Sequence, residues 1–233
     1  MDRPERVAGR SAGVNPRFAL GMDTSTRKLG LALVDEGGAV IAEREEATST
    51  HATRLVPALE WLLASCGAGR GDLCAIGAVT GPGSFTGLRI GLASALGLSR
   101  ALSIPAYGLQ SLRAIALAVP AEGAGLAVMD ARRSQLYCQG FLRREGEVIS
   151  LGEPRALAAE RVLYEMPSPM WAAGDGVALV RGWPAECRLI SEIPNLAVPA
   201  AREALAALAS GRAAAGLLPT YVRPPDVRLP AEV

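Results

Sequence analysis

A glycine-rich segment is the most specific chemical signal in this sequence. It runs Gly81-Pro-Gly-Ser-Phe-Thr-Gly87, between an apolar stretch (Leu73–Thr80) and a stretch rich in glycine and alanine (Leu88–Leu102). The first stretch predicts a buried strand and the second a helix. A glycine turn at a helix start leaves backbone N–H groups that can hold an anion. The same turn can also be a strand-to-helix elbow, in which Ser84 or Thr86 caps the helix.

We favour the elbow, because the segment lacks the spacing of phosphate-binding loops. The Lys-Ser or Lys-Thr pair that closes a Walker loop is absent, and so is the G-x-G-x-x-G spacing. On the residues alone, the glycines serve to turn the backbone tightly between the strand and the helix.

A second candidate site begins where the apolar stretch Phe18–Asp23 ends. Asp23 is followed by Thr24 and Ser25. A carboxylate with hydroxyls in the next turn can organise a magnesium–phosphate group, or it can cap its own turn by accepting backbone N–H bonds. Both interpretations remain open, so Asp23, Thr24 and Ser25, with Gly81 and Gly83, form a candidate vestigial nucleotide site.

His51 is the only histidine of the chain. A catalytic metal needs several ligands close together, and the position one helical turn further on is Leu55. Neither a metal site nor a Ser-His-Asp triad is therefore predicted. We expect His51 to be exposed, or to cap the first turn of a helix, and we predict no catalytic residue in this chain.

Two helices could form a docking face for another protein. The first follows the cap candidates Thr48–Thr50 and carries leucines at helical spacing, and the second carries small residues four apart. Small residues at this spacing let another helix pack close to the backbone. The alternative is burial in the chain's own core, and the two roles can share one surface. The residues concerned are Leu55, Leu59, Leu62, Leu63, Gly87, Gly91 and Ala95.

The remaining elements place these residues in an α/β fold. A three-stranded meander followed by alternating helices and strands predicts a mixed sheet with helices on both faces. The further predicted strands are Leu29–Val34, Ala39–Glu46, Pro105–Gly108 and Met170–Ala173, and the further predicted helices are Ser111–Ala118, capped by Ser111, Arg155–Glu165 and Ala200–Ser210.

A weak internal repeat predicts two lobes. Met22-Asp23 is echoed by Met129-Asp130, and the strand Leu29–Val34 by Leu136–Leu142. The expected divisions are a flexible N-terminal extension (1–17), a first lobe with the docking helices (18–120), a reduced second lobe (121–216) and an extended C-terminal tail (217–233).

Composition narrows the function classes. The chain has 233 residues, half of them hydrophobic, and a net charge of +1. Strong direct binding of nucleic acid is not expected from a chain whose charges nearly balance, although a weak supporting contact stays open.

The sequence predicts neither a secretory signal nor a membrane span. The polar segment Met1–Arg17 lacks the apolar stretch of a secretory signal, and the apolar stretch Ala114–Val128 is too short and interrupted to span a membrane. We therefore expect a cytoplasmic protein without a membrane partner.

Three motifs together resemble the TsaB family, the dimerization subunit of the bacterial tRNA threonylcarbamoyladenosine (t6A) complex. They are Leu20-Gly-Met-Asp-Thr-Ser25, His51 at the start of the first helix, and Gly81-Pro-Gly-Ser-Phe-Thr-Gly-Leu-Arg-Ile-Gly91. Met129–Arg132 and Pro219–Arg223 fit the family as well. The resemblance implies an actin-like (ASKHA, ribonuclease H-like) duplicated α/β fold, with mixed sheets flanked by helices and a reduced second lobe.

The resemblance also implies partners. A TsaD-like catalytic subunit would form a heterodimer with this chain, a TsaE-like ATPase would join, and tRNA would be contacted indirectly or weakly. The catalytic relative holds a metal with a His-x-x-x-His pair, which is broken here at Leu55. ATP and metal therefore belong to the partner subunits, and a homodimer without the partner is an open alternative. The residues expected to bind the partner are His51, Leu55, Leu59, Leu62, Ser84, Phe85, Thr86, Leu88, Arg89, Gly91 and Ala95.

A different function class competes with this hypothesis. Asp23 and the glycine turns would also suit an independent ATP-dependent kinase-like enzyme, or a hydrolase such as a peptidase, of the actin-like superfamily. The sequence offers no evident catalytic base and no set of metal ligands for either activity.

Overall fold

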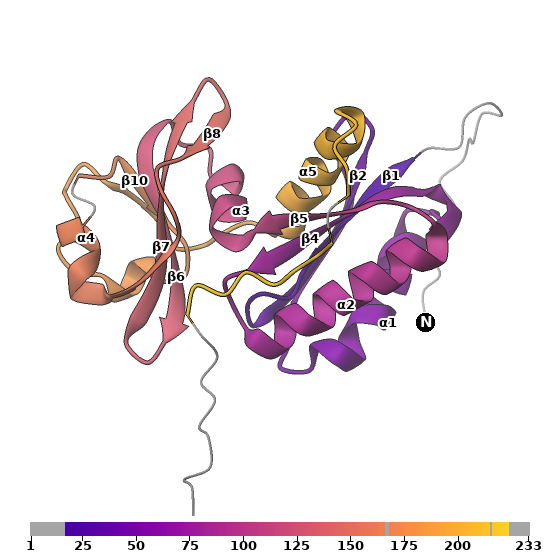
Figure 1. Cartoon of the computed structure of the whole chain (residues 1–233), viewed down its shortest axis with the longest axis horizontal. Helices are drawn as coiled ribbons and strands as arrows, with labels where there is room; N and C mark the ends of the chain where they lie inside the picture. Colours follow the sequence, from indigo (N-terminus) through magenta and orange to yellow (C-terminus); the bar gives the residue numbers. More distant parts are fainter. Residues whose placement is uncertain (1–16, 166–167, 215, 224–233) are drawn as a thin grey trace, which may run out of the picture.

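The computed structural model describes residues 17–165, 168–214 and 216–223. The chain forms two mixed sheets with helices packed against them (Figure 1). The N-terminal extension, apart from Arg17, and the last ten residues lie outside the described part. None of the described helices is both long and apolar enough to cross a membrane.

The first sheet has the order β3-β2-β1-β4-β5. Its strands are β1 (Phe18–Asp23), β2 (Lys28–Asp35), β3 (Val40–Ala47), β4 (Leu73–Gly81) and β5 (Ala106–Gln110). β1, β2 and β3 form the predicted antiparallel meander, whereas β4 pairs parallel with β1 and β5 parallel with β4. Parallel neighbours need crossover connections, which the helices supply.

The second sheet repeats this order as β8-β7-β6-β10-β11. Its strands are β6 (Gly123–Arg132), β7 (Gln135–Arg144), β8 (Glu147–Ser150), β10 (Trp171–Ala173) and β11 (Arg188–Ile190). Three antiparallel strands are again followed by two parallel ones. The shared strand order supports the duplication that the sequence repeat predicted.

Helices cover both faces of the first sheet. α1 (His51–Ser65) and α2 (Phe85–Leu102) lie on one face, and α5 (Ala197–Ala209) lies on the other (Figure 1). α3 (Ser111–Ala118) lies between the two sheets and contacts β4 and α5 as well as β6 and β7. α5 falls within the range expected for the second lobe, yet it packs on β1, β2, β4 and β5 of the first sheet.

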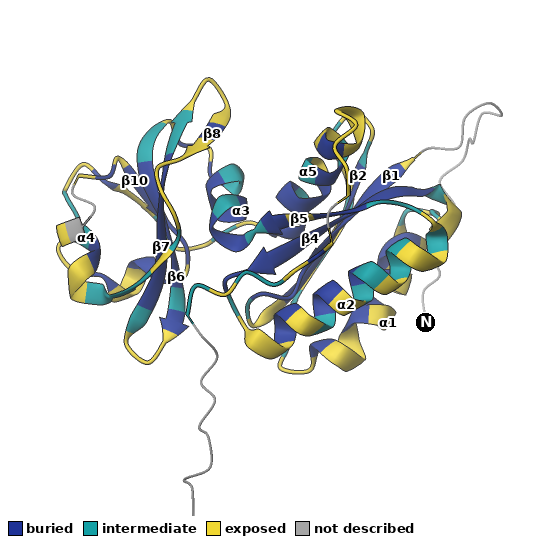
Figure 2. Ribbon diagram, in the orientation of Figure 1, coloured by how far each residue is buried: buried dark blue, intermediate teal, exposed yellow. Residues whose placement is uncertain are grey.

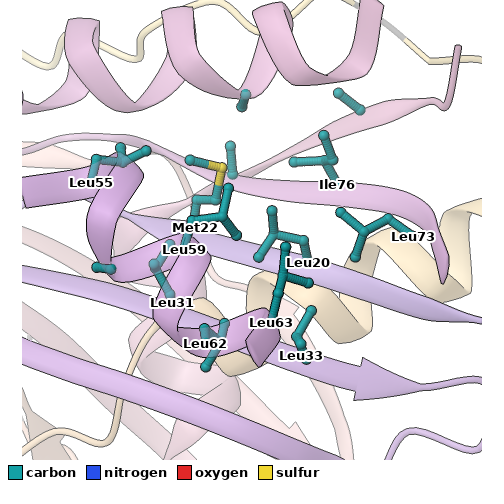
Figure 3. Close-up of a cluster of buried hydrophobic side chains, with 14 of the residues drawn as sticks. Leu20, Met22, Leu31, Leu33, Leu55, Leu59, Leu62, Leu63, Leu73 and Ile76 are labelled. Atoms are coloured by element: carbon teal, nitrogen blue, oxygen red, sulfur yellow. The ribbon is translucent and has the colours of Figure 1, made fainter. Parts of the chain in front are cut away.

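The central strands of both sheets are buried, and exposure is confined to helix faces, turns and edge strands (Figure 2). The core of the first lobe joins the leucines of α1 to β1, β2 and β4 (Figure 3). A second core around α3, with Trp171 and Phe141 at its centre, fills the space between the sheets. Because this core is shared, the two lobes form one packed molecule.

The predicted helix at Arg155–Glu165 is wrong over its first half. Residues Arg155–Ala158 form strand β9, which pairs antiparallel with the first residues of β7, and only a short 3-10 turn and α4 (Val162–Glu165) follow. β8 pairs with the other end of β7. Without β9 the backbone of Gln135–Cys138 would lack this partner, so the need to pair that backbone overrides local helix propensity.

The predicted cap of α3 is also wrong, although its bounds are confirmed. Gln110 holds the N-cap position, and Ser111 is the first residue of the helix. The Ser111 hydroxyl is fully buried and has no hydrogen-bond partner within the described part of the chain. The other predicted strands and helices are found, with ends shifted by up to three residues.

Candidate functional site

The glycine-rich segment is the elbow that the sequence favoured. Ser84 is the N-cap of α2, and its hydroxyl accepts the N–H of Gly87 at 3.2 Å, so Ser84 rather than Thr86 is the cap. A side chain at Gly83, Gly87 or Gly91 would overlap atoms of the turn after β1, namely those of Thr24 and Ser25. The glycines therefore let the start of α2 lie directly against that turn.

The chain's own atoms engage several of the backbone and hydroxyl groups at the start of α2. The Ser84 N–H donates to the Ser25 carbonyl at 2.7 Å, and the Thr24 hydroxyl donates to the Gly87 carbonyl at 2.8 Å. The N–H groups of Gly87 and Leu88 bond to Ser84. Since these amides already have partners, the local geometry favours the elbow over a phosphate loop.

Asp23 caps the turn that follows β1. Its side chain is 5% exposed, and its Oδ1 accepts the N–H of Ser25 at 2.8 Å. Burial raises the pKa of the Asp23 carboxyl above 3.8, outweighing this bond, which lowers it. Of the two interpretations left open by the sequence, these contacts favour the capping role.

We expect Asp23→Asn to stabilise the protein at neutral pH. The folded state holds the Asp23 proton more tightly than the unfolded state, because the pKa is raised on folding. The stabilisation from this group is therefore fully present below the unfolded pKa, and it is lost as pH rises through the raised pKa of the folded state, above which the charged form is unfavourable. Asparagine keeps the acceptor for Ser25 and removes the charge. Urea unfolding at several pH values tests this, with Glu43→Gln on the exposed edge strand as control; a less stable Asn variant at pH 7 contradicts it.

His51 is buried rather than exposed, which corrects the sequence expectation. It is 7% exposed and is the first residue of α1, and its Nε2–H donates to the Lys28 carbonyl at 3.3 Å. One turn on, Leu55 lies in the core. Across residues 17–165, 168–214 and 216–223, no three His, Cys, Asp or Glu side chains are placed to hold a metal together.

A cleft of about 1490 Å³ lies between the two lobes. The first lobe contributes the turn Ser25–Lys28 and the starts of α1 and α2, and the second lobe contributes the β6–β7 hairpin. The predicted nucleotide-site residues Asp23, Ser25 and Gly83 line it, whereas Thr24 and Gly81 do not. Charged groups of both signs face the cleft, so it carries no strongly basic or acidic character.

Asp175 is a cleft residue to which the sequence assigned no role. It follows the glycine turn after β10, and its Oδ1 accepts the N–H of Asp130 at 3.0 Å. Burial raises the pKa of the Asp175 carboxyl. Asp130 in turn accepts the N–H of Arg132 at 2.7 Å. The structure thus joins the segments Met129–Arg132 and Trp171–Gly176, which the sequence alone could not connect.

Seven of the eleven expected partner-binding residues, including His51, are buried and cannot form an exposed docking face. Figure 3 shows Leu55, Leu59 and Leu62 of α1 pointing into the core beside β1 and β2. Besides His51, these buried residues are Leu55, Leu59, Leu62, Leu88, Gly91 and Ala95. The leucine stripe and the glycine row belong to the chain's own core, which is the alternative that the sequence left open. Substitutions at Leu88 or Gly91 would therefore report on folding, not on docking.

The opposite sides of the same helices are exposed and include a strip of uncharged residues, with the exposed charged residues Glu60, Arg89 and Arg100 beside it. We call this strip the outer surface, defined by Ala52 and Val56 of α1 and by Thr86, Ile90, Ala93, Gly97 and Ala101 of α2. The α2 members recur every three or four residues and so lie on one face. Val56 is 55% exposed, Ile90 is half-buried and the others are exposed. A Cβ added at Gly97 would meet no described atom within 4 Å.

The expected docking residues Ser84, Phe85, Thr86 and Arg89 are exposed at the first turn of α2. The Arg89 guanidinium lies 3.8 Å from the ring centre of Phe85, and Arg89 Nε donates to the Tyr221 hydroxyl at 3.3 Å. Tyr221 stacks at a tilt on Phe85, with ring centres 5.5 Å apart. The C-terminal segment thus contributes to this corner of the molecule.

Comparisons with known proteins agree on one family. Residues 37–207 match the family model "TsaD: tRNA N6-adenosine threonylcarbamoyltransferase". The chain is 29% identical over 195 residues to the Escherichia coli tRNA threonylcarbamoyladenosine biosynthesis protein TsaB, covering 80% of this chain and 83% of that protein. It is 36% identical over 128 residues to the Bacillus subtilis protein of the same name, covering 54% of this chain and 56% of that one.

The fold comparison gives the same answer. The crystal structure of YeaZ from Pseudomonas aeruginosa superposes with a TM-score of 0.73 at 28% identity, covering 88% of this chain and 99% of that one. Together with the two mixed sheets flanked by helices, this match confirms the predicted actin-like α/β fold. The chain therefore belongs to the family described by the TsaD model, and within that family to the TsaB group.

Proposed function

We propose that this chain is the non-catalytic partner subunit of the machinery that transfers a threonylcarbamoyl group to the adenosine next to the anticodon of tRNA. In this role it binds a TsaD-type catalytic subunit and supports its active form. The single observation that carries the proposal is the outer surface: two neighbouring helices of a TsaB-group protein present a strip of small and apolar residues to solvent.

The residue types of the outer surface suit helix-on-helix docking. Alanine, glycine and threonine let a second helix approach the backbone of α2 closely. The centre of a protein interface is depleted in charged residues, and none occurs among the seven residues of this surface.

The contacts within the first lobe support an accessory role over an independent one. The start of α2 bonds to the chain's own Ser25 and Thr24, and Asp23 caps its own turn. We assign ATP and metal to the partner subunits, with a TsaE-type ATPase as a further member of the complex. The tRNA is contacted indirectly or weakly, in keeping with the net charge of +1. The relatives named above support this role rather than the alternative of a kinase-like or hydrolytic enzyme.

The proposal places the working complex in the cytoplasm. Without the catalytic subunit, the same outer surface can pair two copies of this chain, since a self-complementary patch forms a two-fold dimer.

The direct test is light scattering on a gel-filtration column. This chain is mixed with the TsaD-type protein of the same organism, and the mass of the eluting species is measured. The proposal expects one species with the summed mass of one copy of each, formed at the expense of any homodimer. Two separate peaks at micromolar concentration would count against it.

A further inference from the structure

The C-terminal segment 217–223, which we call the strap, contacts both lobes and the first turn of α2. Figure 1 shows it in yellow, running from the side of α5 past β4 and β5 toward β6 and β7. We propose that the strap sets the angle between the two lobes and ties that angle to the first turn of α2, so that docking at α2 is transmitted to the cleft.

The strap is fixed to the first lobe at two points. Leu217 is buried in the core beneath α1 and α2. The Thr220 N–H donates to the Thr80 carbonyl at 2.7 Å, at the end of β4. Gly81, with φ of 107°, allows this approach, because a Cβ there would come within 2.8 Å of the Thr220 carbonyl. These contacts hold the strap beside the glycine-rich elbow.

The next residues divide between α2 and the second lobe. Tyr221 joins Phe85 and Arg89 on the first turn of α2. Val222 packs against the core between the two sheets. Arg223 Nη1 donates to Gln135 Oε1 at 2.8 Å, at the start of β7. Three consecutive residues therefore contact α2, the shared core and the second lobe. Because they are adjacent in the chain, a displacement of one contact is expected to shift the other two.

The strap meets the second lobe at a hairpin that borders the cleft. Three consecutive residues of this hairpin have positive φ values, a backbone region that residues with a Cβ seldom adopt. They are Arg132 (62°), Arg133 (54°) and Ser134 (58°). Gln135, the residue held by Arg223, directly follows them. Tyr221, Arg223, Arg132 and Arg133 all line the cleft. The strap thus contacts a tightly turned segment of the second lobe that faces the first lobe. A change in the angle between the lobes would move this segment.

The test measures the angle between the lobes in the isolated chain. Spin labels are placed at Glu43→Cys on β3 and Glu147→Cys on β8, two exposed positions at opposite edges of the two sheets, with Cys66→Ser as background. Pulsed electron resonance then gives the distribution of distances between the labels. The variants Tyr221→Ala and Arg223→Ala should shift and broaden it, whereas Leu218→Ser, at a position 77% exposed, should leave it unchanged.

The connection between the strap and α2 is tested by the variant Phe85→Ala. Phe85 lies on the first turn of α2, and its ring contacts that of Tyr221. The variant should broaden the distribution as Tyr221→Ala does, which a purely local packing role would not produce. A distribution identical to that of the unsubstituted chain in Tyr221→Ala, or in Phe85→Ala, overturns the proposal. Circular dichroism and urea unfolding confirm that the variants are folded.

A second arm rests on the proposed function and adds the TsaD-type protein. Binding should shift the distance distribution of the unsubstituted chain, and the shift should be lost in Tyr221→Ala even at saturation. A shift that persists there contradicts the transmission through the strap. If the TsaD-type protein does not bind at all, the proposed function fails, and the measurements on the isolated chain still decide whether the strap sets the lobe angle.

Discussion

Gly97→Glu is expected to abolish the complex with the TsaD-type subunit while leaving this chain folded. Gly97 lies in the C-terminal half of α2 on the outer surface, and no described atom outside the neighbouring helix backbone lies within 4 Å of a Cβ placed there. Glutamate is a better helix former than glycine, so α2 should not suffer. In the complex, the carboxylate would be buried against a strip of small and apolar residues, which is strongly unfavourable. We expect affinity to fall about 100-fold or more, equivalent to about 2.8 kcal/mol, as measured by isothermal titration.

Two matched variants separate charge from position. Gly97→Ala adds one methyl group at the same site, and it should stabilise α2 by roughly 0.5–1 kcal/mol and bind the partner nearly normally. Ala206→Glu adds the same charge at an exposed position of α5, on the other face of the first sheet, and should leave binding unchanged. Full affinity of Gly97→Glu would show that the partner docks elsewhere.

Gly77→Ala is expected to destabilise the protein strongly, although it adds only one methyl group. Gly77 lies in the centre of β4, where α5 crosses the sheet, and an added Cβ would overlap the carbonyl and carbon of Ala200. The added Cβ would clash with backbone atoms of α5, which cannot rotate away as a side chain can. The helix α5 would therefore have to move away from the sheet. Overpacking of this kind costs about 3 kcal/mol. Gly21 on β1 faces Ala197 of α5 in the same way, and Gly21→Ala should behave alike.

Urea unfolding monitored by circular dichroism provides the measurement for Gly77→Ala. The midpoint should fall sharply with little change in slope. Gly97→Ala is the natural comparison, because it adds the same methyl group to a glycine that has open space. Equal midpoints for the two variants would mean that α5 does not lie as close to β4 as the structure places it.

The position of α1 and α2 could be predicted from the sequence, but the face that each presents to solvent could not. A leucine at every third or fourth residue of α1 marks a face that is buried somewhere, and the sequence cannot distinguish burial in the chain's own core from burial under a partner. Leu55 and Leu62 lie in the core. The outer surface consists of residues such as Ala93 and Gly97, which carry no hydrophobic periodicity strong enough to reveal it.

The glycine-rich segment illustrates a prediction that succeeded locally and fell short at long range. Its position between a strand and a helix identified the elbow, and Ser84 was one of two predicted caps. The glycines are needed because α2 begins directly against Thr24. Thr24 lies 63 residues before Gly87 in the chain but beside it in space, so the sequence alone does not reveal this contact. The same limit explains the error at Arg155–Ala158, because only the unpaired backbone of β7 selects a strand there.

The strand order of the two sheets confirms the weakest of the sequence signals. Few letters are shared between the repeats around Asp23 and Asp130. Even so, both residues lie at or near the end of the strand that leads an antiparallel meander, β1 in one lobe and β6 in the other, and both face one cleft. Topology therefore preserves the duplication better than residue identity does.

The most direct test is to reconstitute the tRNA modification from purified components. The TsaD-type subunit, the TsaE-type ATPase, a source of the threonylcarbamoyl group and unmodified tRNA are incubated with or without this chain, and threonylcarbamoyladenosine is quantified by mass spectrometry. We expect modification only when both this chain and the TsaD-type subunit are present, and none from this chain without it. Undiminished modification after this chain is omitted, or turnover by this chain without the TsaD-type subunit, would contradict the assignment.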